Sequence, residues 1–201
     1  MFINNSKFKG VIPPLAAPLT PDEKIDEKSL RKLIDHAISG GVHGIFILGT
    51  TGEGMRITDK ECERAIQITI NYLAGRAVLL VGCSDFGTQR TIEKMQKMEK
   101  EGIDAFVVTP SYFLPGYTSK ELISHYTKIA QKSSIPIFIY NLPINQQPDI
   151  EVEALDEISK IDNIAGVKDS SQDMDHLMQV IGIFKDRKDF RTFVGTEVYM
   201  V

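Results

Sequence analysis

The chain has 201 residues, of which 42% are hydrophobic and 25% charged, a composition that excludes disordered and fibrous proteins and suits one sizeable globular domain. Its formal net charge of −4 comes from interspersed acidic and basic residues, so we expect no nucleic-acid partner. No apolar run approaches the roughly 20 residues that span a bilayer, and the first ten residues lack the apolar core of a signal peptide. We therefore expect a cytoplasmic protein without a membrane segment.

Cysteine and histidine residues are scattered along the chain. Cys62 and Cys83 lack the spacing of a disulfide or metal motif, so we expect two reduced, packed thiols. The histidines fall in separate segments without ligand spacing, at His36, His43, His125 and His176. We expect no metal.

Seven short apolar runs begin about 30 residues apart, which is the length of one strand followed by one helix. They predict strands over residues 11–17, 45–48, 77–81, 105–108, 135–140, 164–167 and 192–194.

Helical patterns separate these runs. Asp26 is placed to cap a helix that Gly40-Gly41 ends, and Thr58-Asp-Lys-Glu61 and Thr118-Ser-Lys-Glu121 have the spacing of capping boxes. Three further apolar stripes predict helices whose apolar residues, methionines included, belong to the core: Ile92, Met95 and Met98; Val152, Leu155 and Ile158; Leu177, Met178, Ile181 and Phe184.

Alternating strands and helices indicate a parallel sheet covered by helices, either doubly wound or closed into a (β/α)8 TIM barrel. The barrel is favoured because no strand is followed by a G-x-G-x-x-G turn and polar residues follow several strands. A barrel needs eight strands and about 250 residues, whereas this chain ends at about its seventh strand. We expect residues 1–201 to form a single barrel domain that lacks its C-terminal strand and helices, as part of a longer protein.

Lys168 draws attention because it follows a buried strand. Alternation along residues 164–167 places its side chain on the core-facing side at the strand's C-terminal end. Tyr140 ends the fifth predicted strand, at the same rim. An amine and a phenol together suggest imine chemistry, in which lysine is the nucleophile and tyrosine moves protons. Taken singly, a lysine that ends a strand is more often a solvated surface residue. The tyrosine taken singly is as readily an aromatic packed at the rim.

The loop Gly49-Thr-Thr-Gly-Glu-Gly54 follows the second predicted strand. Its glycines allow a ligand to approach the backbone, and Thr50 and Thr51 offer hydroxyl and N–H groups suited to a small carboxylate. We expect Gly49 and Thr51 to bind substrate. The loop is no P-loop, because no Gly-Lys-Ser/Thr follows, and a simple polar turn remains the alternative.

Three motifs occur in order: residues 44–54 followed by Glu61, Tyr140-Asn-Leu-Pro143, and Gly166-Val-Lys-Asp-Ser170. With them the chain resembles, from Gly10 to Gly195, the dihydrodipicolinate synthase/N-acetylneuraminate lyase family of pyruvate-dependent class I aldolases. The resemblance implies a lyase or synthase that needs no cofactor beyond a covalent imine with pyruvate. It also implies a homodimer or homotetramer.

By this resemblance Lys168 is the Schiff-base lysine, Tyr140 the acid–base tyrosine, and Thr50 the hydroxyl that relays protons to it. Thr51 would hold the pyruvate carboxylate. Tyr112 matches a tyrosine that in many members reaches into a neighbouring subunit's site.

The same resemblance places Gly195 at a strand end near bound pyruvate. Asn145 stands where dihydrodipicolinate synthase proper has an arginine for its aldehyde substrate. An uncharged amide cannot form the bidentate charged pair, which disfavours aspartate semialdehyde and suits a 2-oxo sugar acid that is cleaved or dehydrated.

Two other interpretations remain open from the sequence, since a fold does not fix a function. One is a non-catalytic regulatory relative that binds a 2-oxo acid, against which Lys168, Tyr140 and Thr50 argue. The other is a phosphate-binding barrel enzyme, which would need a glycine-rich loop after the seventh or eighth strand.

Overall fold

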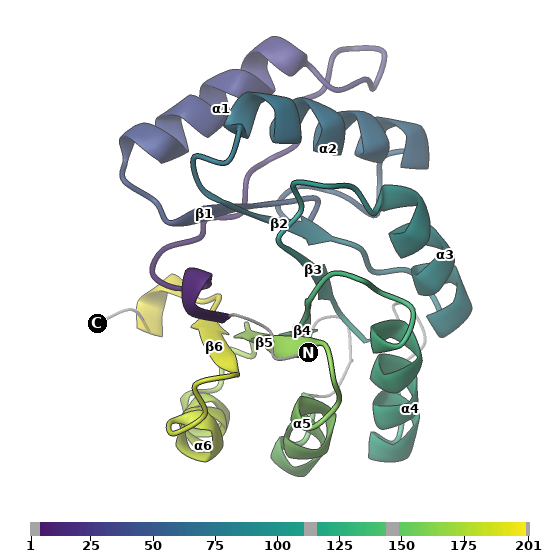
Figure 1. Cartoon of the computed structure of the whole chain (residues 1–201), viewed down its shortest axis with the longest axis vertical. Coiled ribbons are helices and arrows are strands. Elements are labelled where there is room, and N and C mark those ends of the chain that lie inside the picture. The colour runs from purple at the N-terminus through teal and green to yellow at the C-terminus, as the bar shows by residue number, and fades with distance from the viewer. Residues whose placement is uncertain (1–4, 111–115, 144–148, 200–201) are drawn as a thin grey trace. The chain divides into compact units, whose positions relative to one another are not determined.

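The computed structural model describes residues 5–110, 116–143 and 149–199. Helices and parallel strands alternate along this part of the chain, as Figure 1 shows. The chain divides into two compact units. The first unit comprises residues 6–83 and 93–107, and the second comprises residues 1–5, 84–92 and 108–201.

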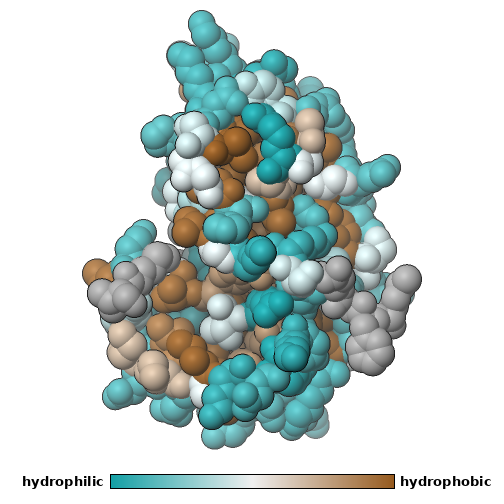
Figure 2. All heavy atoms as spheres, turned by 60° about the vertical axis from the view of Figure 1, so that its left-hand side comes forward, coloured by the Kyte–Doolittle hydropathy of each residue, from teal (hydrophilic) through white to brown (hydrophobic). Residues whose placement is uncertain are grey.

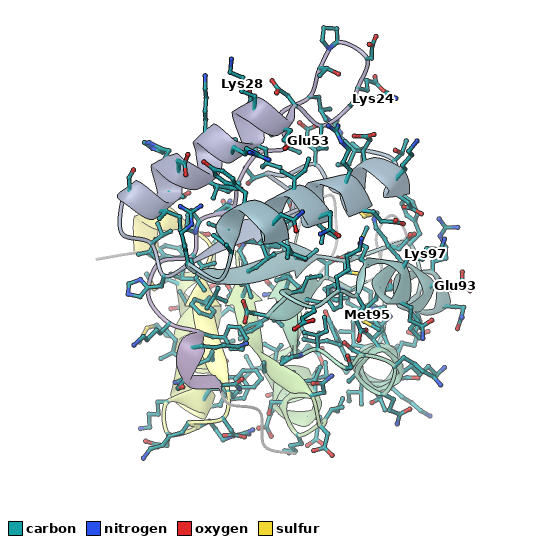
Figure 3. The ribbon with its side chains drawn as sticks, turned by 45° about the horizontal axis from the view of Figure 1, so that its top comes forward. Lys24, Lys28, Glu53, Glu93, Met95 and Lys97 are labelled. Atoms are coloured by element: carbon teal, nitrogen blue, oxygen red, sulfur yellow. The ribbon has the colours of Figure 1, made fainter. Side chains whose placement is uncertain are left out.

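The first unit contains a parallel sheet in which Gly44 lies opposite Val78 and Leu80 opposite Ala105. The paired helices α1 and α2 lie side by side in this unit (Figure 1). Helix α3, which enters the unit at Glu93, buries Met95 and exposes Glu93 and Lys97 (Figure 3). In chain order these elements are α1 (Glu27–Ser39), β1 (Gly44–Ile47), α2 (Asp59–Leu73), β2 (Val78–Gly82), α3 (Thr88–Met98) and β3 (Ala105–Val108), of which residues 105–107 belong here.

The second unit also holds a parallel three-stranded arrangement. Tyr140 lies opposite Lys168, and Lys168 lies opposite Phe193. The elements are α4 (Ser119–Ala130), β4 (Ile137–Asn141), α5 (Val152–Ser159), β5 (Ile164–Asp169), α6 (Met174–Phe184) and β6 (Arg191–Val194). Two 3₁₀ turns complete the described chain, η1 (Asn5–Lys7) and η2 (Glu197–Tyr199).

Six of the seven predicted strands are confirmed, and the first is wrong. Residues 11–17 form only an isolated parallel bridge, between Pro14 and Phe46. The segment does run beside β1, because Leu15 N–H donates to Phe46 O at 2.8 Å and Phe46 N–H donates to Pro13 O at 3.0 Å. Pro13 and Pro14 have no N–H to donate, so a continuous ladder cannot form.

The predicted helix starts are confirmed at Asp26 and Thr118, and Thr118 with Glu121 forms a reciprocal capping box. Thr58 also caps its helix, but the predicted box there is wrong. The carboxylate of Glu61 turns away and accepts the backbone N–H of Ile25 at 2.8 Å. The buried N–H of Ile25 thus replaces the backbone N–H of Thr58 as the partner of the Glu61 carboxylate.

Burial follows the predicted stripes in most helices, with one correction in α6. Its buried residues are Leu177, Val180 and Phe184, whereas Met178 and Ile181 are exposed beside that stripe. Figure 2 shows hydrophobic side chains reaching the surface among hydrophilic ones on one face of the molecule. No helix among the described residues is long and apolar enough to cross a membrane.

Both cysteines are buried thiols, as predicted. Burial raises the pKa of Cys62 to about 11, which keeps this thiol protonated and unreactive at neutral pH.

Candidate active site

Lys168 and Tyr140 face each other at the C-terminal ends of β5 and β4. Their Cα atoms are register partners, and Lys168 Nζ lies 4.1 Å from the centroid of the Tyr140 ring. Tyr140 is buried and Lys168 half-buried. The amine therefore lies against the face of the ring, in the range of a cation–π contact.

Gly195 completes this strand-end group from the end of β6. Its N–H donates to Asp169 O at 2.6 Å. A Cβ atom added at this glycine would lie 2.9 Å from Lys168 Cε and would collide with Ser170 Oγ. The Lys168 side chain can adopt this position because Gly195 has no side chain.

The loop after β1 belongs to the first unit. Thr50 and Thr51 are exposed at its tip, and Glu53 N–H donates to Thr50 O at 3.1 Å. A Cβ atom added at Gly49 would lie 2.5 Å from the Phe46 ring, so the turn requires glycine there. The two threonines are thus presented to solvent by a tightly packed turn.

Two predicted site residues, Tyr112 and Asn145, lie outside the described residues. The structure thus brings together Lys168, Tyr140 and Gly195 in the second unit, and groups Gly49, Thr50 and Thr51 in the first.

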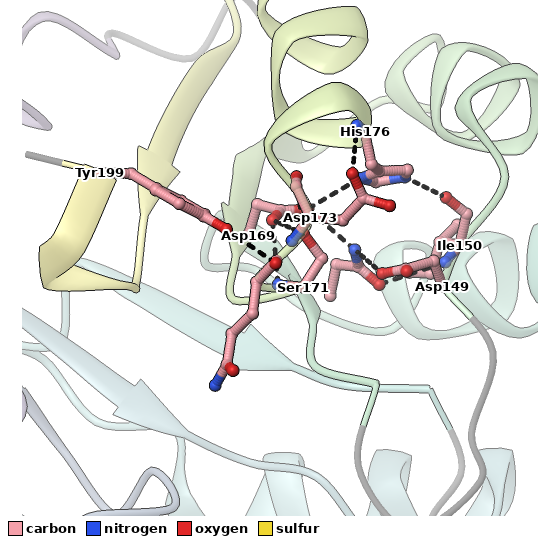
Figure 4. Close-up of polar contacts among 9 residues, drawn as sticks. Asp149, Ile150, Asp169, Ser171, Asp173, His176 and Tyr199 are labelled. Carbon is pink, nitrogen blue, oxygen red and sulfur yellow. Dashed lines mark hydrogen bonds and ion pairs between the residues drawn. The ribbon is translucent and has the colours of Figure 1, made fainter.

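A polar network behind Lys168 was missed by the sequence analysis. The carboxylate of Asp169 is buried and accepts Asn141 Nδ2 at 2.8 Å, Ser171 N–H at 3.0 Å and Ser171 Oγ at 2.6 Å (Figure 4). Burial alone would raise the pKa of Asp169. The contacts from His176, Asn141 and Ser171 outweigh burial and lower this pKa below its ordinary value.

A signal for this network was present in the motifs. Asn141 directly follows Tyr140, and Asp169 directly follows Lys168. Because neighbouring strand residues point to opposite faces, a polar residue after each candidate catalytic residue must find its partner on the helix-covered face.

A pocket of about 450 Å³ lies elsewhere, in the first unit, and includes none of the predicted site residues. Figure 3 labels two of its lining side chains, Lys24 and Glu53. Among residues 5–110, 116–143 and 149–199, no group of three or more His, Cys, Asp or Glu side chains is arranged to hold a metal ion.

Comparisons with known proteins all point to one family. The model of the dihydrodipicolinate synthetase family matches residues 7–201. The 4-hydroxy-tetrahydrodipicolinate synthase of Methanothermobacter thermautotrophicus is 35% identical over 194 residues, which cover 95% of this chain and 68% of the relative. That of Protochlamydia amoebophila is 36% identical over 179 residues, covering 89% and 59%. The chain therefore spans only about 60 to 70% of the length of these relatives.

Solved structures agree with the predicted fold class. YagE, a prophage protein of the dihydrodipicolinic acid synthase family from E. coli K12 in complex with pyruvate, matches with a TM-score of 0.88 and 27% identity over 94% of this chain and 64% of its own. Dihydrodipicolinate synthase from Bacteroides thetaiotaomicron matches with a TM-score of 0.87 and 34% identity over 94% and 63%. The fold is part of a (β/α)8 barrel, and the chain belongs to the dihydrodipicolinate synthetase family.

Proposed function

We propose that the chain carries the imine-forming site of a pyruvate-dependent lyase or synthase. The observation that carries this proposal is the contact at 4.1 Å between Lys168 Nζ and the Tyr140 ring, at a strand end kept open by Gly195. Membership of the family and the pyruvate complex of YagE support the choice of pyruvate as the electrophile.

In the proposed reaction the neutral amine of Lys168 attacks the ketone carbon of pyruvate and forms a carbinolamine. Tyr140 delivers a proton to the departing hydroxyl group, which leaves as water and gives an iminium ion. Loss of a methyl proton then gives an enamine that attacks an aldehyde. Hydrolysis of the product iminium regenerates Lys168, and the reverse sequence cleaves a longer 2-oxo acid.

The remaining roles are proposed from family membership. Thr50 would relay protons to Tyr140, and Gly49 and Thr51 would bind the pyruvate carboxylate. Tyr112 would complete the relay from a neighbouring subunit of a homodimer or homotetramer in the cytoplasm. No cofactor is needed, because the iminium itself accepts the electron pair.

The acceptor aldehyde is proposed from the residue at position 145. Asn145 offers hydrogen bonds and no charge, so it suits the hydroxyl groups of a sugar-derived aldehyde better than a carboxylate.

Deuterium exchange tests the proposal through its enamine. In D2O the protein should replace the methyl hydrogens of pyruvate with deuterium, followed as the loss of the methyl signal in proton NMR spectra. We expect Lys168→Ala to abolish this exchange and Tyr140→Phe to slow it by about 10² to 10⁴. Lys160→Ala is the matched control, because Lys160 is exposed and paired with Asp156 and Glu157.

The control variant should exchange at the wild-type rate. Pyruvate that binds without any exchange would instead favour a non-catalytic relative.

A further inference from the structure

The network behind the proposed site joins the ends of two strands. Asn141 is 1% exposed, and its Nδ2 donates both to Asp169 Oδ2 and to Asp149 Oδ1, at 2.9 Å in the second case. Its Oδ1 accepts Ile150 N–H at 3.1 Å. One amide thus ties the end of β4 to the end of β5 and to the segment before α5 (Figure 4).

His176, near the start of α6, contacts this network through both of its ring nitrogens. Its Nε2 lies 2.9 Å from Ile150 O, and its Nδ1 lies 3.3 Å from Asp169 Oδ2 (Figure 4). The carbonyl and the ionised carboxylate are both acceptors, so each ring nitrogen needs a proton to face its neighbour favourably. Both neighbours are oxygen acceptors at ion-pair or hydrogen-bond distance, so the surroundings favour an imidazolium ion over either neutral tautomer.

The surroundings of this ring favour the positive charge. Asp169 is the largest cause, with smaller contributions from Ile150 O and from Asp149, and together they raise the pKa of His176 to about 9 against the effect of burial. Asp173, the N-cap of the same helix, accepts the backbone N–H of His176 at 3.1 Å. The charged groups that act on the ring are thus Asp169 and Asp149, whereas Asp173 contacts the backbone of His176.

The network and the proposed catalytic pair occupy opposite faces of the same two strands, at successive positions. Tyr140 lies opposite Lys168 in the register, and Asn141 lies opposite Asp169. The backbone is fixed as well, because Ser170 N–H donates to Asn141 O at 2.9 Å. Any shift of Asp169 relative to Asn141 must therefore move Lys168 relative to Tyr140.

We propose that His176 is a positioning residue for the reaction at Lys168, which rests on the function proposed above. As a half-buried cation it holds Asp169 against Asn141 and so fixes the amine against the Tyr140 ring. Removing the charge leaves Asp169 buried with one partner fewer and loosens the strand ends. A small misplacement of reacting groups slows an enzymatic reaction by up to about 10²-fold.

The test is the rate at which a borohydride-trappable adduct appears after mixing the full chain with pyruvate. We expect His176→Gln to lower this rate about 10- to 100-fold with little change in the pyruvate concentration that gives half-maximal rate. His176→Arg keeps a charged donor and should restore the rate to within about threefold of wild type.

The pH profile separates positioning from a merely structural role. Dividing the wild-type rate by the His176→Arg rate removes the pH dependence that the two proteins share. This ratio should be constant below pH 8 and fall above about pH 9, where His176 loses its proton. If His176→Gln does not fold, this ratio carries the test alone.

The matched control is Thr118→Ala, which weakens the cap of α4 but removes none of the network's hydrogen bonds, and it should leave the trapping rate unchanged. A wild-type rate in His176→Gln, or a ratio that stays flat to pH 10, would overturn the positioning role while the adduct itself still supports the proposed function. No adduct in the folded wild type would overturn both.

Discussion

At the end of β5, consecutive residues serve different purposes. Lys168 turns toward the Tyr140 ring, while Asp169 turns toward Asn141 and His176. Alternation along a strand makes this division possible, because successive side chains point to opposite faces of the sheet although they are only about 3.3 Å apart along the strand. The position of the amine therefore depends on a residue on the other face of the strand.

Gly195 gives the most direct test at this scale. We expect Gly195→Ala to reduce adduct formation with pyruvate at least tenfold, because the new Cβ atom would lie 2.9 Å from Lys168 Cε. The measurement is the yield of borohydride-trapped adduct by intact mass spectrometry.

Gly182→Ala is the matched control, since a Cβ atom there meets nothing within 4 Å. Gly182 lies inside α6, so this variant should trap at the wild-type rate and gain about 0.5–1 kcal/mol in free energy of unfolding. Equal adduct yields in the two variants would show that the space beside Lys168 is not needed.

Among the elements, Glu61 and Glu121 share a position but not a role. Each stands three residues after a capping threonine, yet Glu61 accepts the N–H of Ile25 at 2.8 Å and is 6% exposed, whereas Glu121 is an exposed partner of Thr118. We expect Glu61→Ala to cost about 1–3 kcal/mol, because a buried N–H loses its acceptor.

Glu121→Ala should cost clearly less, because water replaces the lost acceptor. Urea denaturation of both variants makes the comparison, and equal losses would show that Glu61 is an ordinary capping-box residue.

These elements also show what the sequence can predict. Periodicity and capping residues predicted the six confirmed strands and helices α1 to α6, because those signals depend on neighbours along the chain. The first strand was wrong because prolines remove ladder donors from an otherwise apolar run. Residues whose partners are distant in sequence escaped prediction: Glu61 accepts the N–H of Ile25, and His176 contacts the carbonyl of Ile150.

The candidate site was likewise predicted only in part. The strand-end rule and the family resemblance gave Lys168, Tyr140 and Gly195, which the structure places together. His176 seemed an isolated histidine, since its role depends on a carboxylate presented by β5 and a carbonyl before α5.

For the molecule as a whole, the buried His125 and the half-buried His176 predict losses of stability at opposite ends of the pH range. The pKa of His176 is raised to about 9, so its contribution is complete below pH 6.5 and is lost as pH rises through 9. Burial lowers the pKa of His125 to about 4, so the native state resists its protonation, and stability is lost as pH falls from 6.5 toward 4.

The contribution of each histidine is measured as the difference in free energy of unfolding between wild type and the variant that lacks it. The free energy of unfolding of wild type minus that of His176→Gln should shrink between pH 7 and 10, and the same difference for His125→Gln should shrink between pH 7 and 4. One proton limits either slope to about 1.4 kcal/mol per pH unit. A flat difference for His176→Gln above pH 7 would contradict its assignment as an imidazolium.

The measurement that tests the central claim most directly is borohydride reduction in the presence of pyruvate, followed by peptide mass spectrometry. The account predicts one reduced pyruvate adduct, on Lys168, present in wild type and in Lys160→Ala and absent in Lys168→Ala. An adduct on another lysine, or none on the folded wild-type protein, would contradict the assignment of Lys168 as the nucleophile.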